Sequence, residues 1–384
     1  MSSNGKLEKL PIRILNLFTI MDRGGAETMV MNYYREIDKS KVQFDFLVHR
    51  EKIGVYETEI KELGGKIFRM PSIRPGGFIR YYYQMRFFFR EHPEYKVLHA
   101  HMSELACIAF FAAYKEGVPV RICHAHNAPH GWDYKIPIKN CFKIAMRPYI
   151  THMFACGIEA GIWLYGKNNQ GQFIYMHNAI DTNTFRYDPI KRKILREKHG
   201  LSDKLVIGHV GRFTKQKNQL YLLKIMCSLI EKNPDSILLL IGTGPLETDL
   251  RKQVKRTGLS EHVEFMGFRE DVNDLLQVMD VFLMPSLYEG VSVALIEAQA
   301  SGLLCVASAE QPKEVDITDQ IYHLSLRRSP VEWARFILEM SCCYKREDSS
   351  ASIKAAGYDI INNAKKLEHF YIEVQNGKDE ITLE

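Results

Sequence analysis

Short runs of valine, isoleucine and leucine alternate with helix-length segments along almost the whole chain, and this alternation limits the folds that are open to it. Strands that are apolar throughout, with helices between them, are typical of parallel sheets covered on both faces. The sequence therefore predicts an α/β protein. Strands are expected at 12–20, 42–48, 66–69, 97–100, 120–123, 153–155 and 173–175, and again at 205–210, 237–241, 263–265, 281–284 and 303–307.

The length of 384 residues suits two domains of ~150–190 residues better than one core. We expect doubly wound, Rossmann-like domains in residues 1–187 and 188–355, joined by a polar connector at 186–203. The tail, 356–384, has apolar residues at roughly helical spacing and is expected to be a helix that packs back toward the first domain. Further helices are expected at 26–36, 219–232, 246–256, 271–277 and 292–301.

Composition places the chain among globular proteins, since 46% of its residues are hydrophobic and 25% are charged. No apolar run reaches the ~18–20 residues that a membrane-spanning helix needs. The polar segment 1–11 predicts no signal peptide, and the eight cysteines form no CxxC pair. We therefore expect reduced thiols and a cytoplasmic protein.

Positive charge is concentrated in the first half of the sequence. Residues 1–187 hold 25 Lys and Arg against 17 Asp and Glu, a net charge of +8, while the remaining residues hold 26 against 29, a net charge of −3. This imbalance favours an anionic partner, such as a phosphorylated ligand or a lipid surface. It is too small to indicate nucleic acid, and the sequence contains no zinc-finger or RNP-like motif.

The segment 78–90, which starts at Phe78, combines Arg80, Arg86 and Arg90 with seven aromatic residues. A basic aromatic helix can lie on an anionic membrane surface, which would make the protein peripheral at the inner face of the cell membrane. Its apolar residues do not keep to one narrow stripe, so two alternatives stay open. These are core packing with a solvated edge and contact with single-stranded nucleic acid.

Two carboxylates follow the strand at 281–284, where a doubly wound sheet binds its ligands. Glu289 and Glu297 are separated by eight residues, a helical rise of ~12 Å, which is roughly the span of a sugar nucleotide. Gly290 lets the backbone approach a ligand closely. The alternative is a capped surface helix with two solvated acids. The amides that would face a diphosphate belong to Val291, Ser292 and Val293.

Two other turns carry groups that suit an anion. Arg212 offers a planar fork and Lys217 a compact charge after the strand at 205–210, and together they could neutralise a departing nucleoside diphosphate. A solvated basic loop is the alternative. Gly24 and Gly25 supply bare amides at the start of the helix at 26–36, although an ordinary turn is the alternative because no GxGxxG motif is present.

Histidines follow two of the strands. His126 could hydrogen-bond a sugar hydroxyl or the reacting centre as a neutral imidazole, and a satisfied core or loop histidine is the alternative, as it is for His99 and His101. His124 and His126 could suggest a metal, but no third ligand stands nearby in the sequence, and neither an HExxH nor a DxD motif is present.

The combination of these motifs resembles the family-4 retaining glycosyltransferases of GT-B fold, in particular those of bacterial exopolysaccharide, capsule and lipopolysaccharide biosynthesis. The resemblance implies two Rossmann-like domains that face each other across a cleft, with a C-terminal closing helix. The positions that carry it are Glu289-x7-Glu297, Gly211-Arg212…Lys217, Gly24-Gly25, His126 and Asn178-Ala179-Ile180-Asp181.

The resemblance also implies a role for each motif. Glu297 would bind the ribose hydroxyls, and Glu289 would hold the donor hexose. Arg212 and Lys217 would grip the diphosphate with help from the backbone amides. His126 would lie near the anomeric carbon of the donor.

The implied activity is transfer of a hexose from a nucleotide sugar, expected to be UDP-linked, to a glycan or lipid-linked acceptor. Retention of configuration is expected, with no metal or other cofactor. A nucleotide-sugar epimerase on the same scaffold and a non-catalytic sugar- or lipid-binding module are the alternatives. Two positions depart from the family pattern without threatening it: Ser292, where Pro or Gly is frequent, and Ala179, where Gly is commoner.

Overall fold

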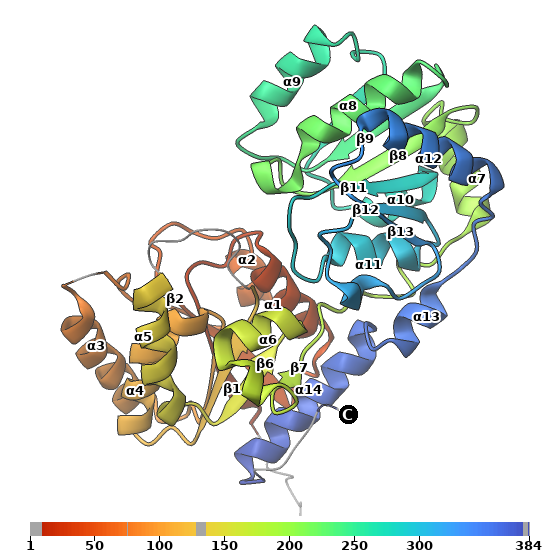
Figure 1. The fold of residues 1–384 in the computed structure, drawn as a ribbon. Coiled ribbons are helices and arrows are strands. Elements are labelled where there is room, and N and C mark those ends of the chain that lie inside the picture. The colour runs from red at the N-terminus through yellow and green to blue at the C-terminus, as the bar shows by residue number, and fades with distance from the viewer. Residues whose placement is uncertain (1–9, 75, 128–135, 379–382, 384) are drawn as a thin grey trace, which may run out of the picture. The chain divides into compact units, whose positions relative to one another are not determined.

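The computed structural model describes residues 10–74, 76–127, 136–378 and 383, so most of the polar segment 1–11 lies outside the described residues. The chain divides into two compact units. We call them unit 1 (Met1–Ala179 with Ile360–Glu384) and unit 2 (Ile180–Asp359). Each unit is built on its own parallel sheet (Figure 1).

The sheet of unit 1 has seven strands in the order β3-β2-β1-β4-β5-β6-β7. The strand order reverses at β1, as in a Rossmann fold. Its strands are β1 (Ile12–Phe18), β2 (Val42–Val48), β3 (Ile67–Arg69), β4 (Val97–Ala100), β5 (Val120–Ala125), β6 (His152–Ala155) and β7 (Ile174–Tyr175). Its helices are α1 (Gly25–Glu36), α2 (Glu57–Glu62), α3 (Phe78–Glu91), α4 (Cys107–Lys115), α5 (Ile136–Met146), α6 (Ile158–Tyr165) and α14 (Ile360–Gln375).

The sheet of unit 2 has six strands in the order β10-β9-β8-β11-β12-β13, with the same reversal. Its strands are β8 (Leu205–Val210), β9 (Ser236–Ile241), β10 (Val263–Gly267), β11 (Val281–Met284), β12 (Leu304–Ser308) and β13 (Ile321–Leu324). Its helices are α7 (Pro189–Lys198), α8 (Gln219–Ile230), α9 (Glu247–Arg256), α10 (Val272–Val278), α11 (Val293–Ala300), α12 (Pro330–Cys343) and α13 (Ser350–Ala355).

Both faces of each sheet are covered, which explains why the strands are apolar throughout. In β1, Ile14 belongs to a core cluster shared with α1 and α14, whereas Leu15 and Leu17 belong to a second cluster shared with α3 and α4. In β8, Val206 and Ile207 divide between two clusters in the same way. Successive side chains of a strand point to opposite faces, so both must be apolar. The predicted doubly wound α/β class is confirmed.

The last helix, α14, belongs to unit 1, although the chain reaches it only after completing unit 2. Leu367, Phe370 and Tyr371 are buried in the same cluster as residues of α1 and β2. Each of these side chains removes apolar surface from water, worth ~1.5–3 kcal/mol. This helix is the closing helix that the apolar spacing of the tail predicts.

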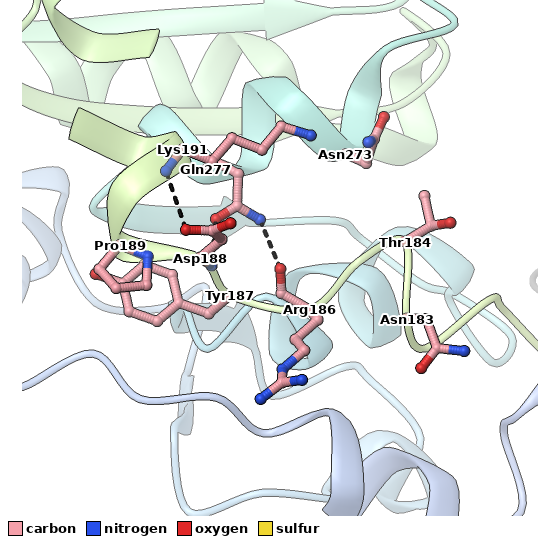
Figure 2. A pocket seen from close by; sticks show the side chains of 9 residues that line it. All are labelled: Asn183, Thr184, Arg186, Tyr187, Asp188, Pro189, Lys191, Asn273 and Gln277. Carbon is pink, nitrogen blue, oxygen red and sulfur yellow. Dashed lines mark hydrogen bonds between the residues drawn. The ribbon is translucent and has the colours of Figure 1, made fainter. Parts of the chain in front are cut away.

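The prediction that 186–203 is only a connector is wrong, because this segment contains helix α7. Asp188 caps the helix through its carboxylate, and Arg196 pairs with Asp280 at 3.1 Å (Nη1 to Oδ2). The Gln277 side-chain amide of α10 donates to the Arg186 carbonyl at 3.0 Å (Figure 2). These bonds fix the segment to unit 2.

This segment and α10 line a pocket of ≈ 550 Å³. Figure 2 shows the side chains that line it. Its charged side chains already have partners, since Arg186 pairs with Asp348 and Lys191 with Asp274. We assign no ligand to this pocket.

Within the ranges that the structure describes, no helix combines the length and apolar character needed to cross a bilayer.

Candidate functional site

Two loops of unit 2 are joined at the carboxyl end of its sheet. One follows β8 and contains a 3-10 turn at Lys215–Lys217, and the other follows the neighbouring strand β11. The Leu287 N–H donates to the Gln216 carbonyl at 2.8 Å, and the Gln216 amide donates to the Tyr288 carbonyl at 3.0 Å. The Asn218 amide donates to the Pro285 carbonyl at 3.0 Å. The two loops therefore hold each other in place.

The same loops bring two predicted site residues into contact. The Lys217 Nζ lies 2.7 Å from Oε1 of Glu289, and the two side chains are only 17% and 7% exposed. Breaking a buried pair by removing one partner costs ~3–5 kcal/mol. Arg212 is exposed and finds no carboxylate among the described residues. The loop thus offers the exposed guanidinium of Arg212 and, five residues later in the sequence, an ammonium that Glu289 already neutralises.

Helix α11 begins at the end of this loop. Ser292 is its N-cap with an extended backbone, and its hydroxyl lies 3.4 Å from the sulfur of Met284 instead of capping the helix. No side chain in the described residues caps this helix, and the Leu295 N–H donates to the Ser292 carbonyl at 3.2 Å. The positive end of the helix dipole favours an anion near this turn. Glu297 lies one turn further on and is half-buried, and burial raises its pKa to about 7.

Two glycines after β9 support the backbone that carries Arg212. Gly242 has φ +130°, and a Cβ there would lie 2.2 Å from the Gly211 carbonyl oxygen. A Cβ at Gly244 would lie 2.4 Å from the Phe213 carbonyl oxygen. Any larger side chain would push the two loops apart. The glycines therefore serve close backbone packing rather than a GxGxxG motif.

In unit 1, Gly24 and Gly25 begin helix α1 at the carboxyl end of the sheet, and Gly24 is the N-cap. The side chain of Glu27 folds back over this point, because a Cβ at residue 24 would lie 2.1 Å from its Oε2. Burial raises the pKa of Glu27. A phosphate on these amides would meet this carboxyl group, so Glu27 would have to move away or take up a proton.

His126 belongs to a block of four imidazoles at the ends of β4 and β5. His99 and His124 are nearly coplanar and are linked at 3.2 Å (Nε2 to Nδ1), and His101 and His126 are linked at 2.9 Å (Nδ1 to Nε2). The two linked pairs stack on each other. The ring centroids are 4.2 Å apart for His99 over His101 and 4.2 Å for His124 over His126.

The surroundings of this block fix where its protons lie. Oδ1 of Asn16 can only accept, so it accepts from Nε2 of His101 at 3.3 Å. Nδ1 of His101 must then accept from Nε2 of His126. Burial lowers the pKa of His126 to about 3. His126 is therefore a neutral imidazole near pH 7, and its Nδ1 carries a lone pair.

The fold brings His99 and His101 close to His124, although the sequence near His124 and His126 offers no third metal ligand. Nitrogen atoms of His99, His101 and His124 lie within 4.8 Å of one another, close enough for one metal ion. These rings instead hydrogen-bond to each other, to Asn16 and to Tyr371, whose hydroxyl lies 2.7 Å from Nδ1 of His99. A metal would have to displace those bonds. The absence of a metal stays a prediction.

The predicted site residues thus fall into two groups. Lys217 and Glu289 meet directly. Arg212 lies five residues before Lys217 in the same loop, and the loop of Glu289 leads into the helix that carries Glu297. Gly24, Gly25 and His126 lie on unit 1. Their roles in binding and catalysis stay predictions. Sequence reasoning missed three positioning residues: Gln216, Asn218 and Tyr371.

The three arginines of the predicted membrane segment, which forms helix α3, differ in their ion-pair partners. Arg86 and Arg90 both bind Glu116, and Arg80 is exposed with no carboxylate partner in the described part of the chain. Tyr81 and Phe89 are buried in the core. Membrane contact through this helix stays a prediction, with Arg80 as its remaining free cation.

Comparison with known proteins identifies the family. Residues 204–341 match the family described as Glycosyl transferases group 1. The chain is 36% identical, over 94% of its length and 96% of the relative's, to a Bacillus subtilis (strain 168) protein named glycosyltransferase EpsF. The chain belongs to the group 1 glycosyltransferases. The Escherichia coli UDP-Gal:alpha-D-GlcNAc-diphosphoundecaprenol alpha-1,3-galactosyltransferase is 28% identical over 56% of this glycosyltransferase and 58% of its own chain.

Solved structures show the fold of this glycosyltransferase. Anabaena Alr3699/HepE in complex with UDP has a TM-score of 0.77 at 17% identity, and the match covers 94% of this chain and 100% of that one. WaaG, a glycosyltransferase involved in lipopolysaccharide biosynthesis, has a TM-score of 0.67 at 15% identity, with 96% and 100% covered. The predicted GT-B class, with two Rossmann-like halves, is confirmed.

Proposed function

We propose that this glycosyltransferase transfers a hexose from a UDP-sugar to a glycan or lipid-linked acceptor in polysaccharide biosynthesis, with retention of configuration and without a metal. The observation that carries the proposal is the cationic loop of Arg212 and Lys217. This loop is fixed to the loop of Glu289, which leads into the N-terminus of α11.

The ion pair suggests how the donor enters. A diphosphate carries more negative charge than one carboxylate, so it would draw Lys217 away from Glu289. Arg212, which has no competing carboxylate in the described ranges, would bind the same diphosphate through its planar fork. The released carboxylate of Glu289 would then accept hydrogen bonds from the hexose hydroxyls, and Glu297 would accept from the ribose.

The chemistry of transfer follows from the charges. Arg212, Lys217 and the amides of α11 would stabilise the negative charge that grows on the leaving diphosphate, which is the largest single contribution in many enzymes. His126, as a neutral imidazole, would hydrogen-bond near the anomeric carbon without adding charge. Attack from the face of the departing diphosphate would retain the configuration.

Two relatives support the choice of donor and acceptor. The E. coli relative is named for UDP-Gal as donor and a diphosphoundecaprenol-linked sugar as acceptor. The Anabaena protein of similar fold has been solved with UDP-glucose bound. On this basis, UDP is the nucleotide that we propose for the donor of this chain.

Melting temperature with a panel of nucleotides and nucleotide sugars tests the donor, because a ligand that binds only the folded protein raises it. UDP and one or more UDP-sugars should raise it. Glu297→Ala should lose nucleotide affinity, whereas Glu289→Ala should mainly lose turnover. Wild-type behaviour of both variants would refute the site.

Four further measurements test the alternative functions, the stereochemistry of transfer and the absence of a metal. Conversion of a UDP-sugar to its epimer without an acceptor would indicate an epimerase, and nucleotide binding without transfer to any acceptor would indicate a binding module. The anomeric coupling constant of the product, measured by NMR, distinguishes retention from inversion. Full activity after prolonged treatment with EDTA is expected if no metal takes part.

A further inference from the structure

Unit 1 contains two hollows that join along Arg69, Met70 and Pro71, the segment that ends and follows β3. The first, of ≈ 610 Å³, is lined by residues that follow β2 and β3. The second, of ≈ 810 Å³, runs along one face of α3. Neither hollow includes a residue that the proposed donor site uses, so both are free to bind something else.

The first hollow is cationic. Arg69 is held in place by the buried Glu57, with 2.7 Å between Nη2 and Oε2. Arg50 and Arg74 also line it, are exposed, and meet no carboxylate partner within the described residues. Glu51 is the single acidic residue of the lining. Free guanidinium groups suit phosphate oxygens, which they bind through two parallel hydrogen bonds.

The base of the first hollow is neutral and firmly held. The ring of His49 bonds the Phe18 carbonyl at 3.0 Å and the Tyr81 hydroxyl at 2.8 Å. The Ser72 hydroxyl donates to the His49 carbonyl at 2.8 Å. Burial lowers the pKa of His49 to about 4, so the ring is uncharged near pH 7. The arginines therefore surround a preformed polar surface that costs little to order on binding.

The second hollow is lined by aromatic side chains that face water. Tyr83 and Phe87 are 62% and 64% exposed and lie four residues apart, so they share one face of α3. Ile79, one turn before Tyr83, is 74% exposed. Arg80, also in the lining, adds another cation. Large apolar side chains in an exposed row mark a binding surface rather than a solvated helix face.

We propose that the joined hollows bind the diphosphate and the first isoprene units of a prenyl-diphosphate-linked acceptor. The diphosphate lies among Arg50, Arg69 and Arg74, and the hydrocarbon lies on Tyr83 and Phe87. This inference rests on the proposed function, whose acceptor it specifies. A soluble sugar phosphate would fill only the cationic hollow. The pairing of a cationic hollow with an aromatic one matches a ligand that is charged at one end and apolar at the other.

The sheet sets the distance from this site to His126. Strand β2 is separated from β5 by β1 and β4, and neighbouring strands lie ~4.8 Å apart, so β2 is ~14 Å from the strand that precedes His126. A diphosphate bound beyond β2 and β3 therefore leaves room for the sugar part of the acceptor. The reactive hydroxyl of that sugar would point toward the block of histidines.

The test titrates the full-length protein with farnesyl diphosphate by calorimetry, in saturating UDP so that the nucleotide site cannot take up the probe. Saturable binding is expected. Arg50→Glu combined with Arg74→Glu should weaken it by roughly tenfold or more. Phe87→Ser should weaken it by roughly five- to tenfold and leave the affinity for inorganic diphosphate unchanged.

Two exposed residues outside both hollows provide matched controls. Lys61→Glu reverses an exposed charge, and Ile144→Ser removes an apolar side chain that is 67% exposed. Both should bind farnesyl diphosphate like the wild type. UDP affinity, measured on the same samples, should be unchanged in every variant. If the wild type does not bind UDP, the proposed donor site is refuted. If it binds UDP but not farnesyl diphosphate, only the inference about the acceptor is refuted.

Three results would overturn the inference. The first is the absence of saturable binding to the wild type, and the second is equal binding to the wild type and the double arginine variant. The third concerns vesicles that contain phosphatidylglycerol. If the variants lose binding to these vesicles but keep wild-type affinity for farnesyl diphosphate, the surface is a membrane contact and not an acceptor site.

Discussion

The two candidate sites are built at the same edge of similar sheets but from opposite chemistry. In unit 2, the loops after β8 and β11 carry Arg212, Lys217 and Glu289, all charged, with one ion pair nearly buried. In unit 1, the ends of β4 and β5 carry four stacked histidines, and burial lowers the pKa of each.

Two sheets of similar topology can therefore carry loops that suit different parts of one transfer reaction. Under the proposed function, the ion pair of unit 2 would exchange its carboxylate partner for the diphosphate of the donor. The histidines of unit 1, which burial keeps neutral, would supply hydrogen bonds that do not change with pH.

The largest effect is expected at the ion pair. Lys217→Met should lower the rate of transfer by ~10²–10³-fold, because the leaving diphosphate loses a charged partner. It should also lower the melting temperature, since Glu289 is left buried and unpaired. Combining it with Glu289→Gln should restore the melting temperature without restoring the rate. Lys215→Met, an exposed lysine in the same turn, is the control, and a wild-type rate in Lys217→Met would contradict the prediction.

A smaller loss is expected for the neutral site. His126→Gln should reduce the transfer rate by ~10–100-fold, the value of one or two hydrogen bonds. Because the pKa of His126 is about 3, the rate of the wild type should show no inflection from this group between pH 5 and 8. His369→Gln, at an exposed position on α14, is the control. A loss below twofold would remove His126 from the site.

A further effect is expected at Glu297, whose pKa is raised by burial. The pKa is about 7 in the folded protein against 4.5 for the free group, so folding favours the protonated form. The stability from this group is complete below pH 4.5 and is lost as the pH rises through 7, by about 2 kcal/mol after allowance for partial exposure. Glu297→Gln should therefore melt higher than the wild type at pH 8 but not at pH 4. Equal differences at both pH values would contradict the shift.

The smallest effect is expected at the edge of the histidine block. Tyr371→Phe removes the hydroxyl that bonds His99 and should lower the free energy of unfolding by about 1 kcal/mol. The urea midpoint measures this change, and the affinity for UDP should stay the same because Tyr371 lies in unit 1. Tyr114→Phe, at an exposed position, should shift neither quantity. An unchanged midpoint in Tyr371→Phe would show that the bond does not hold the block.

Strands that are buried on both faces could be predicted from the sequence because burial leaves a continuous apolar run. Strands β2, β4, β8 and β11 have the predicted bounds. Strand β13 was missed because it is at the edge of its sheet and most of its residues are only half-buried, which permits tyrosine and histidine in place of an apolar run. Helix α7 was missed because it is polar, although Asp188 followed by Pro189 is a helix start signal.

The site was predictable residue by residue but not as a set of contacts. Lys217 and Glu289 stand out because loops at strand ends carry ligands, yet their ion pair depends on β8 and β11 being neighbours in the sheet. The histidine block likewise depends on β4 pairing with β5. Tyr371 lies far along the chain from His99, and no local pattern links the two.

Helix α14 also orders the events of synthesis. Unit 2 is complete in the nascent chain at residue 359, whereas unit 1 lacks helix α14 until residues 360–375 have also been made. The unit whose synthesis starts first is thus the unit whose core is completed last. A chain that stopped before α14 would leave the apolar side chains of α1 and β2 without their packing partners.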